Sequence, residues 1–348
     1  MDPADVWVEA VAHATSPPEL STVGTDVAVV HEGLEVRRYE GLEPDTDQEV
    51  EGFAFRTLPA PGELLATFAT VNDVHFGEEV CGLIDGSDVG PVFRSAPGDD
   101  PFPEVMNRGA IAEITAMGPA AVLVKGDLTS DGTQAELDAF LGMYGPAFGD
   151  RLTYVRGNHE SYPRAPFAAD PFQQVDLPGA SLVLLDTSVD GAVAGTVTEA
   201  QLEQLDELAA RADRPVLVFG HHHLGDPASR EKADQTFGID LDASARLVEL
   251  VARRPRIRGY FAGHTHRNRV RRFAPTGAVP WVEVACVKDY PGTWAEYRVH
   301  EGGIVQIAHR ISTPEALAWT EKTRHMYHGL YHDYAFGSLA DRCFAIST

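Results

Sequence analysis

The stretch LLATFATVNDVHF, residues 64–76, decides the fold, because a mostly apolar run ends there directly in an Asn-Asp-x-His group. After it, short apolar runs alternate with segments of helical periodicity as far as IRGYFAG, residues 257–263. Strands that are covered on both faces are typically continuous apolar runs. We therefore predict a layered α/β fold, with the functional groups on loops at the ends of the strands.

The regions on either side of this α/β pattern predict different structure. Residues 1–63 contain short β-type runs separated by turn clusters, and predict a small N-terminal all-β unit. From AVPWVEVACVKDY, residues 278–290, onward, three runs alternate like antiparallel strands of a second sheet. Residues 311–348 start with a Thr-Pro-Glu helix signal and predict a C-terminal helical tail, which packs on a main domain of residues 64–310.

The segment 77–106 is rich in Gly, Pro and Asp and shows little periodicity. It is too long for an ordinary connection between two elements. Two interpretations stay open, a lid over a site or an insertion on the surface.

The formal net charge of −24 limits the partners of this 348-residue chain. Such a charge repels polyanions, so nucleic acid is an unlikely partner. An anionic substrate has to meet local positive charge, which bound metal ions or the arginine-rich stretch 253–272 could provide. The alternative for these arginines is a solvated strand edge and helix end.

The N-terminal residues and the cysteines indicate the compartment. The start MDPADVWVEAV lacks the basic and apolar parts of a secretory signal, and no apolar run is long enough to predict a membrane span. Cys81, Cys286 and Cys343 are far apart and form no C-x-x-C pair, which favours a reducing environment. We expect a cytoplasmic protein.

Motifs rich in potential metal ligands follow successive predicted strands. They are Asp73-Val-His75, Gly126-Asp127, Gly157-Asn158-His159-Glu160, His221-His222-His223 and Gly263-His264-Thr265-His266. Groups at the mouths of neighbouring strands converge on one edge of a sheet. Imidazole together with carboxylate suits zinc, manganese and iron, and a carboxylate such as Asp127 can bridge two cations about 3.5–4 Å apart. The sequence therefore predicts a dinuclear metal centre.

The ordered set D-x-H, G-D, G-N-H-E, H and G-H-x-H resembles the signature of calcineurin-like metallophosphoesterases over about residues 64–310. The resemblance implies a four-layer α/β/β/α sandwich with two metal ions, of iron, manganese or zinc. It also implies a ligand set. The first metal would be held by Asp73, His75 and His266, the second by Asn158, His221 and His264, and Asp127 would bridge them.

The chemistry implied by the resemblance is phosphoester hydrolysis. Two metal ions would polarise the phosphoryl group and lower the pKa of a bound water, so that hydroxide attacks the phosphorus in line. His159 matches the family histidine that contacts the phosphate and assists the leaving group; its alternative is to orient neighbouring groups only. Asn158, His222 and Arg267 are further candidates for substrate contacts, and His222 is also an alternative to His221 as the ligand.

Two branches of the superfamily compete for the closer resemblance. Residues 126–160 and 185–222 are similar to class III cyclic-nucleotide phosphodiesterases, which usually have G-N-H-D where this chain has Glu160. Purple acid phosphatases share G-N-H-E and an N-terminal β domain, but Ser130 stands where they have a metal-ligating tyrosine. We expect a phosphodiesterase for small phosphodiesters, with 3′,5′-cyclic nucleotides as the leading candidates, and a phosphomonoesterase as the alternative.

The C-terminal segment offers histidines and tyrosines for a second role. His325, His328 and His332 share one face if a single helix persists, and the tyrosines at 327, 331 and 334 lie among them. These rings either stack on a substrate base or form a packed aromatic helix over the sheet. The N-terminal unit is a candidate surface for homo-oligomer formation.

Overall fold

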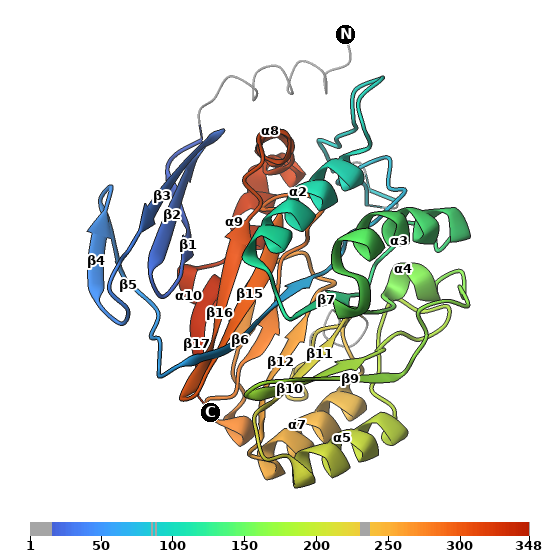
Figure 1. Cartoon of the computed structure of the whole chain (residues 1–348). Helices are drawn as coiled ribbons and strands as arrows, with labels where there is room; N and C mark the ends of the chain where they lie inside the picture. The colour runs from blue at the N-terminus through green and yellow to red at the C-terminus, as the bar shows by residue number, and fades with distance from the viewer. Residues whose placement is uncertain (1–15, 85, 88, 230–236, 348) are drawn as a thin grey trace.

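Two six-stranded β-sheets pack face to face in the computed structural model, and helices cover their outer faces (Figure 1). Phe68, Phe219 and Tyr297 belong to the apolar layer between the sheets, and the rings of Phe68 and Tyr297 stack at 4.5 Å. This arrangement confirms the predicted four-layer α/β/β/α sandwich. The structure describes residues 16–84, 86–87, 89–229 and 237–347.

The first sheet has a parallel part and an antiparallel part. Its strands β6, β7 and β8 are parallel, and the remaining three strands are antiparallel to their neighbours. In spatial order the strands are β17 (Cys343–Ser347), β16 (Gly303–Arg310), β15 (Thr293–His300), β6 (Leu64–Val71), β7 (Ala121–Lys125) and β8 (Leu152–Val155).

The second sheet has a parallel centre with one antiparallel strand at each edge. In spatial order its strands are β13 (Arg269–Arg271), β14 (Trp281–Glu283), β12 (Ile257–Ala262), β11 (Val216–Gly220), β10 (Ala180–Leu185) and β9 (Phe172–Leu177). β10 and β11 are buried along their whole length, which explains why their sequences are continuous apolar runs.

Helices α2 (Phe102–Met117), α3 (Gln134–Phe148) and α8 (Pro314–Thr323) pack on the first sheet. Helices α5 (Glu199–Arg211) and α7 (Leu241–Arg253) pack on the second. Thr133 and Thr198 start α3 and α5 with capping boxes, in which each threonine accepts a backbone N–H of the first turn. None of the helices in the described residues is both long and apolar enough to cross a membrane.

The N-terminal part forms small antiparallel sheets beside the main sandwich, as predicted (Figure 1). The elements are β1 (Glu19–Val23), β2 (Val27–Glu32), β3 (Glu35–Glu40), β4 (Asp47–Val50) and β5 (Phe53–Arg56). β1 lies against β16, where the Thr22 hydroxyl donates to the Ala308 carbonyl at 2.8 Å. Arg342 donates to the backbone carbonyls of Leu20 and Ser21 at 2.7 and 3.0 Å. The unit is therefore anchored to the first sheet. Residues 1–15 of the predicted unit lie outside the described residues.

The prediction of an antiparallel strand over residues 278–290 is wrong. Only β14, residues 281–283, is a strand there, and it runs parallel to β12 on one side and antiparallel to β13 on the other. The following residues leave the sheet, and the Val287 amide donates to the Asn72 carbonyl at the end of β6. All residues from 281 to 290 are buried, including Glu283, Lys288 and Asp289, so the alternation does not distinguish a buried face from an exposed one. β15 and β16 are antiparallel, as predicted, but they lie in the first sheet beside β6 and do not share a sheet with β14.

The C-terminal segment begins with the expected helix but does not continue it. α8 ends at Thr323, and Tyr327 and His328 have positive φ angles of 53° and 57°. The three histidines at 325, 328 and 332 therefore do not lie on one helix, which corrects that prediction. The chain continues through η3 (Tyr327–Gly329), α9 (Leu330–Phe336) and α10 (Leu339–Arg342), and ends in strand β17 of the first sheet.

Glu19 on β1 connects the N-terminal unit to the C-terminal segment. Its carboxylate is 3.2 Å from Arg310, 2.7 Å from Arg324 and 2.5 Å from His332. Burial would raise the pKa of Glu19, but the hydrogen bond from His332 and the charges of Arg324 and Arg310 lower it to about 2. Because this pKa is depressed from 4.5, the stabilisation is complete above pH 4.5 and is lost as the pH falls towards 2.

We predict that Glu19→Gln lowers the free energy of unfolding at pH 7 by about 3 kcal/mol, because the buried Arg310 and Arg324 lose one of their two carboxylate partners and keep only Glu321. The variant should also lose stability less steeply than the unchanged chain between pH 4.5 and pH 2. Urea unfolding followed by circular dichroism at several pH values measures both effects. Glu40→Gln is the control, because Glu40 is 71% exposed and pairs with Arg38 on the surface. Equal pH profiles for all three proteins would contradict the prediction.

Candidate metal centre

The carboxyl ends of strands from both sheets open onto the same edge of the sandwich, where the predicted motifs lie. Asp73, His75, Asp127, His264 and His266 all have positive φ angles, between 48° and 68°. Residues other than glycine adopt this conformation at an energetic cost, and such strain concentrates at functional sites. The backbone is thus bent at these ligand candidates to turn their side chains inward.

A first cluster joins Asp73, His75, Asp127 and His266, whose donor atoms lie within 4.8 Å of one another. His266 Nε2 is 3.4 Å from Asp73 Oδ1, and His75 Nε2 is 3.5 Å from Asp127 Oδ2. The three predicted ligands of the first metal therefore stand together with the predicted bridge.

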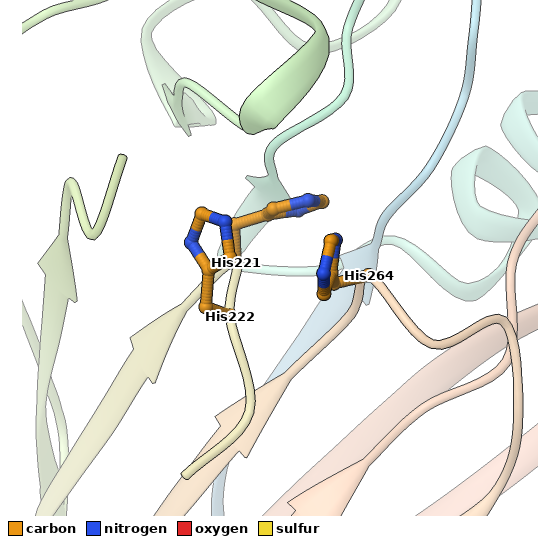
Figure 2. Close-up of side chains that lie close together, drawn as sticks. All are labelled: His221, His222 and His264. Carbon is orange, nitrogen blue, oxygen red and sulfur yellow. The ribbon is translucent and has the colours of Figure 1, made fainter. Parts of the chain in front are cut away.

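A second cluster forms around His221 at the end of β11 (Figure 2). His221 Nε2 is 3.0 Å from Asn158 Oδ1 and 3.3 Å from Asp127 Oδ2. The His264 ring is 5.0 Å from the His221 ring, centre to centre. Asp127 Oδ2 thus lies near imidazoles of both clusters, His75 on one side and His221 on the other, which is the position that a bridging carboxylate needs.

His222 is close to the second cluster, but both of its ring nitrogens have other partners. Nδ1 is 2.8 Å from the Thr187 hydroxyl, and Nε2 is 3.0 Å from the Val193 carbonyl oxygen. His221 uses only Nδ1 for a backbone carbonyl, that of Lys125 at 2.9 Å, and its Nε2 faces the cluster. The geometry therefore favours His221 over His222 as the metal ligand.

The donors of both clusters fit metal ions. His75 is buried, and neither of its ring nitrogens has a hydrogen-bond partner. Burial would raise the pKa values of Asp73 and Asp127, but His266 and His221 respectively hold both below the ordinary range. Two ionised, buried carboxylates surrounded by imidazoles need compensating charge, and such a set suits borderline divalent cations.

Comparison with known proteins agrees with this geometry. Residues 66–268, more than half of the chain, match the profile of calcineurin-like phosphoesterases. The chain belongs to the calcineurin-like phosphoesterase family. The family resemblance predicted from the motifs is thus confirmed, and the family supports the expected hydrolysis of phosphoesters.

Two curated relatives of this phosphoesterase are named as cyclic-nucleotide enzymes. The chain is 30% identical over 176 residues to the 3′,5′-cyclic adenosine monophosphate phosphodiesterase CpdA of Pseudomonas aeruginosa. This match covers 49% of this chain and 63% of CpdA. It is 31% identical over 183 residues to a probable cyclic nucleotide phosphodiesterase of Rhodococcus erythropolis, covering 48% and 58%. The chain thus spans less than two thirds of the length of these relatives.

A dimetal phosphatase from Danio rerio has a similar structure, with a TM-score of 0.56. The sequence identity is 16%, and the match covers 72% of this phosphoesterase and 98% of that chain. At this identity the similarity supports the fold alone.

Arg267, a candidate for contact with the phosphate, has its guanidinium directed to other partners. Its Nε donates to Glu283 at 2.8 Å, and its guanidinium lies 5.1 Å from the centre of the Tyr334 ring. Arg269 and Arg271 also lie within 4.0 Å of the buried Glu283 carboxylate. These arginines compensate a buried acid, and Arg267 does not line the cavity described next.

A cavity of about 730 Å³ is lined by His159 and by residues of both clusters, namely His75, Asp127, His266, Asn158 and His264. The segment 77–106 and the C-terminal segment form part of its wall. The apolar and aromatic residues that line it are Val80, Leu83, Ile84, Tyr162, Phe237, Tyr327, Tyr331 and Tyr334. Of the two interpretations of segment 77–106, the structure favours a cover of the site over a remote surface insertion.

The sequence interpretation missed Glu78, Lys288 and Asp289, which also line the cavity. Lys288 Nζ is 2.5 and 2.6 Å from the two carboxylate oxygens of Glu78. Burial would lower the pKa of Lys288, but Glu78 and its neighbours raise it above the ordinary value. The sequence does contain a signal for these two cavity residues, because Lys288 and Asp289 follow β14 as the other motifs follow their strands. The alternation over residues 278–290 hides it, because that pattern predicts an antiparallel strand.

His159 and Glu160 are held by the neighbouring ligand loop. The His159 amide donates to Asp127 Oδ1 at 3.0 Å, and His159 Nδ1 is 2.6 Å from the Ser130 carbonyl oxygen. Glu160 accepts from the Thr129 amide at 2.8 Å and hydroxyl at 2.6 Å, and from the Gly157 amide at 2.6 Å. The glutamate therefore fastens the G-N-H-E loop, with helix α4 (Asn158–Ser161), to the Gly126-Asp127 loop.

Gly157 is required at the contact between these two loops. A Cβ atom at this position would lie 2.1 Å from Asp127 Oδ1, closer than any real contact. Only glycine lets the backbone pass so close to the carboxylate of the predicted bridge.

We predict that Glu160→Ala weakens metal binding and destabilises the fold by about 2–4 kcal/mol, because two buried backbone amides lose their acceptor. Glu160→Gln should cost less, because the amide oxygen can still accept hydrogen bonds from one of the loops. Thermal unfolding with and without Mn²⁺ measures both effects. Glu136→Ala is the matched control, because Glu136 forms a capping box at the exposed start of α3. Equal losses in Glu160→Ala and Glu136→Ala would show that Glu160 has no special role.

Proposed function

We propose that this chain is a phosphodiesterase that hydrolyses small phosphodiesters with two bound divalent metal ions, and that 3′,5′-cyclic nucleotides are its leading candidate substrates. The observation that supports this best is the composition of the cavity. Residues of both ligand clusters and His159 line it together with aromatic and aliphatic side chains. Such a wall suits a phosphate that carries organic groups. The names of the two curated relatives agree with this proposal.

The charges in the cavity also favour a diester over a monoester. Among the described residues that line it, Lys288 is the only lysine or arginine, and it is paired with Glu78. Asp131 and Asp289 add further negative charge. A phosphomonoester carries about −1.5 to −2 charges at pH 7, whereas a diester carries one. Like charges in a confined site repel, so the monoanion is favoured.

In the proposed arrangement, Asp73, His75 and His266 hold one metal ion, Asn158, His221 and His264 hold the other, and Asp127 bridges them. The bound ions would supply Lewis acidity and lower the pKa of a coordinated water. Asp127 also accepts a hydrogen bond from the His159 amide, so that imidazole would stand beside a phosphate bound at the metal ions.

His159 is the proposed general acid. Because His159 Nδ1 is 2.6 Å from the Ser130 carbonyl oxygen, it acts as the donor there, and the other nitrogen, Nε2, is available to the substrate. In the imidazolium form, with a proton on each ring nitrogen, Nε2 would give its proton to the departing alcohol oxygen as the bond from phosphorus to that oxygen breaks, which leaves a neutral ring protonated at Nδ1.

We predict that manganese-loaded protein hydrolyses bis(p-nitrophenyl) phosphate faster than p-nitrophenyl phosphate. Asp127→Asn should lower this activity more than roughly 100-fold, because the bridging charge is lost. Release of p-nitrophenol, measured with bound metal quantified by mass spectrometry, tests both statements. Asp186→Asn is the matched control, because Asp186 is a buried carboxylate that pairs with Arg156 and does not line the cavity.

The outcomes of this assay separate the candidate functions. Preference for the diester justifies a screen of cyclic nucleotides. Preference for the monoester would replace the proposal with a phosphomonoesterase, which uses the same ligand set. Failure to hydrolyse either ester with two metal ions bound would refute both.

We further predict that His159→Ala lowers kcat by about 10²–10⁴-fold for a diester with an alkyl leaving group, and much less for one with a p-nitrophenyl leaving group. A good leaving group departs without a proton, so it does not need the acid. The kcat values for the two esters, measured with the same metal content, give the comparison. His325→Ala is the control, since His325 does not line the cavity. An equal decrease for both esters would contradict the acid role.

A further inference from the structure

Two imidazoles of the first cluster each stand between two carboxylates. His75 Nε2 is 3.5 Å from Asp127, and its Nδ1 is 3.5 Å from Glu78 Oε2. His266 Nε2 is 3.4 Å from Asp73, and its Nδ1 is 3.8 Å from Asp289 Oδ2. Glu78 and Asp289 thus occupy equivalent places on the outer side of the cluster. We call Glu78 and Asp289 the outer carboxylates.

A single lysine joins the outer carboxylates. Lys288 Nζ is 2.5 and 2.6 Å from the oxygens of Glu78 and 3.7 Å from Asp289 Oδ2. The Lys288 side chain is 6% exposed. A buried ammonium group is costly unless it is paired, and here it has two carboxylate neighbours. The lysine therefore fixes the distance between the two outer carboxylates.

Asp289 is also fixed by one hydroxyl and two thiol groups, of which the hydroxyl and one thiol come from distant parts of the chain. Its Oδ1 accepts from the Tyr331 hydroxyl at 2.7 Å and from the Cys286 thiol at 2.9 Å. The Cys81 thiol is 3.5 Å from Oδ2. Tyr331 belongs to α9, and Cys81 belongs to segment 77–106. These contacts leave Asp289 little freedom to turn away from His266.

The second cluster has a different support. His221 Nδ1 is 2.9 Å from the Lys125 carbonyl oxygen, and His264 Nε2 is 2.8 Å from the Phe237 carbonyl oxygen. Neutral carbonyls thus contact the outer nitrogens there, whereas charged carboxylates face those of the first cluster. At 3.5 and 3.8 Å these carboxylates do not hydrogen-bond the outer nitrogens, but their negative charge favours the tautomer with its proton on Nδ1 and so leaves Nε2 to a metal ion.

We propose that Glu78 and Asp289, joined by Lys288, are positioning residues that present Nε2 of His75 and His266 to the first metal ion, and that this position binds divalent metal more tightly than the second. The inference rests on the proposed two-metal function. Neither outer carboxylate belongs to the ligand set proposed above, so both act through the imidazoles.

The test is a calorimetric titration of metal-free protein with Mn²⁺. The unchanged chain should bind two ions with different affinities. Glu78→Gln and Asp289→Asn should each weaken the tighter position about 10–100-fold and leave the weaker one within about twofold. The variant His264→Ala, which lacks a ligand of the second cluster, should lose the weaker position and so assigns the two.

Glu296→Gln is the matched control. Glu296 is a buried carboxylate that contacts an imidazole, His309 Nε2 at 2.8 Å, on strand β15. It does not line the cavity, so both Mn²⁺ affinities should stay unchanged. Circular dichroism of each metal-free variant shows whether it is folded. An outer-carboxylate variant that does not fold is replaced by Glu78→Asp or Asp289→Glu, which keep the charge but move the carboxylate, and which should weaken the tighter position more than the weaker one.

The results separate this inference from the proposed function. Unchanged affinities in both outer-carboxylate variants, equal weakening of both positions, or no uptake of Mn²⁺ by the unchanged chain would overturn the inference. Selective weakening in a protein that binds two ions but hydrolyses no phosphodiester would support the positioning role and refute the proposed function.

Discussion

The position of Asp127 is the constraint on which the rest of the site depends. Its carboxylate is buried at the end of β7 in the first sheet, yet it lies 3.3 Å from His221 at the end of β11 in the second. A buried carboxylate without compensating charge costs several kcal/mol. The two sheets must therefore meet with their edges aligned, and Lys125 Nζ adds a contact between them by donating to the Ala262 carbonyl at 2.8 Å. Gly157 keeps the space beside the carboxylate open.

Contacts run without interruption from the N-terminal unit to the cavity. Glu19 on β1 pairs with Arg324 and His332, and α9, which contains His332, also contains Tyr331. Tyr331 in turn donates to Asp289 in the cavity wall. The N-terminal strands thus support the C-terminal segment that covers the site. This explains how an appended β unit contributes to a catalytic domain while none of its described residues lines the cavity.

Much of the fold could be predicted from the sequence, because each central strand is buried and therefore apolar, and because the ligand motifs follow those strands in order. Residues whose roles depend on distant partners could not be predicted. Arg267 looks available for a phosphate until Glu283 is seen beside it. His222 looks equivalent to His221 until Thr187 and Val193 are found at its two nitrogens.

Backbone breaks were equally hidden. The positive φ angles of Tyr327 and His328 interrupt the expected C-terminal helix before Gly329, and neither residue type by itself signals a break. Lys288 and Asp289 were missed because residues 281–290 are buried on every side, so their alternation carries no information about strand direction. Sequence periodicity distinguishes buried residues from exposed ones, and it gives no information about a segment in which every residue is buried.

The distribution of charge leads to a last conclusion about how an anion enters this site. The chain carries a net charge of −24, and the arginines beside the last ligand motif lie against Glu283. Lys288 is paired with Glu78. Among the described residues, the cavity therefore offers a phosphate no lysine or arginine without an acidic partner. In the proposed function, the two metal ions must supply the attraction for the substrate as well as the chemistry. Removal of metal would then abolish the binding of a phosphodiester in addition to its hydrolysis, because the carboxylates of the site would face the anion directly.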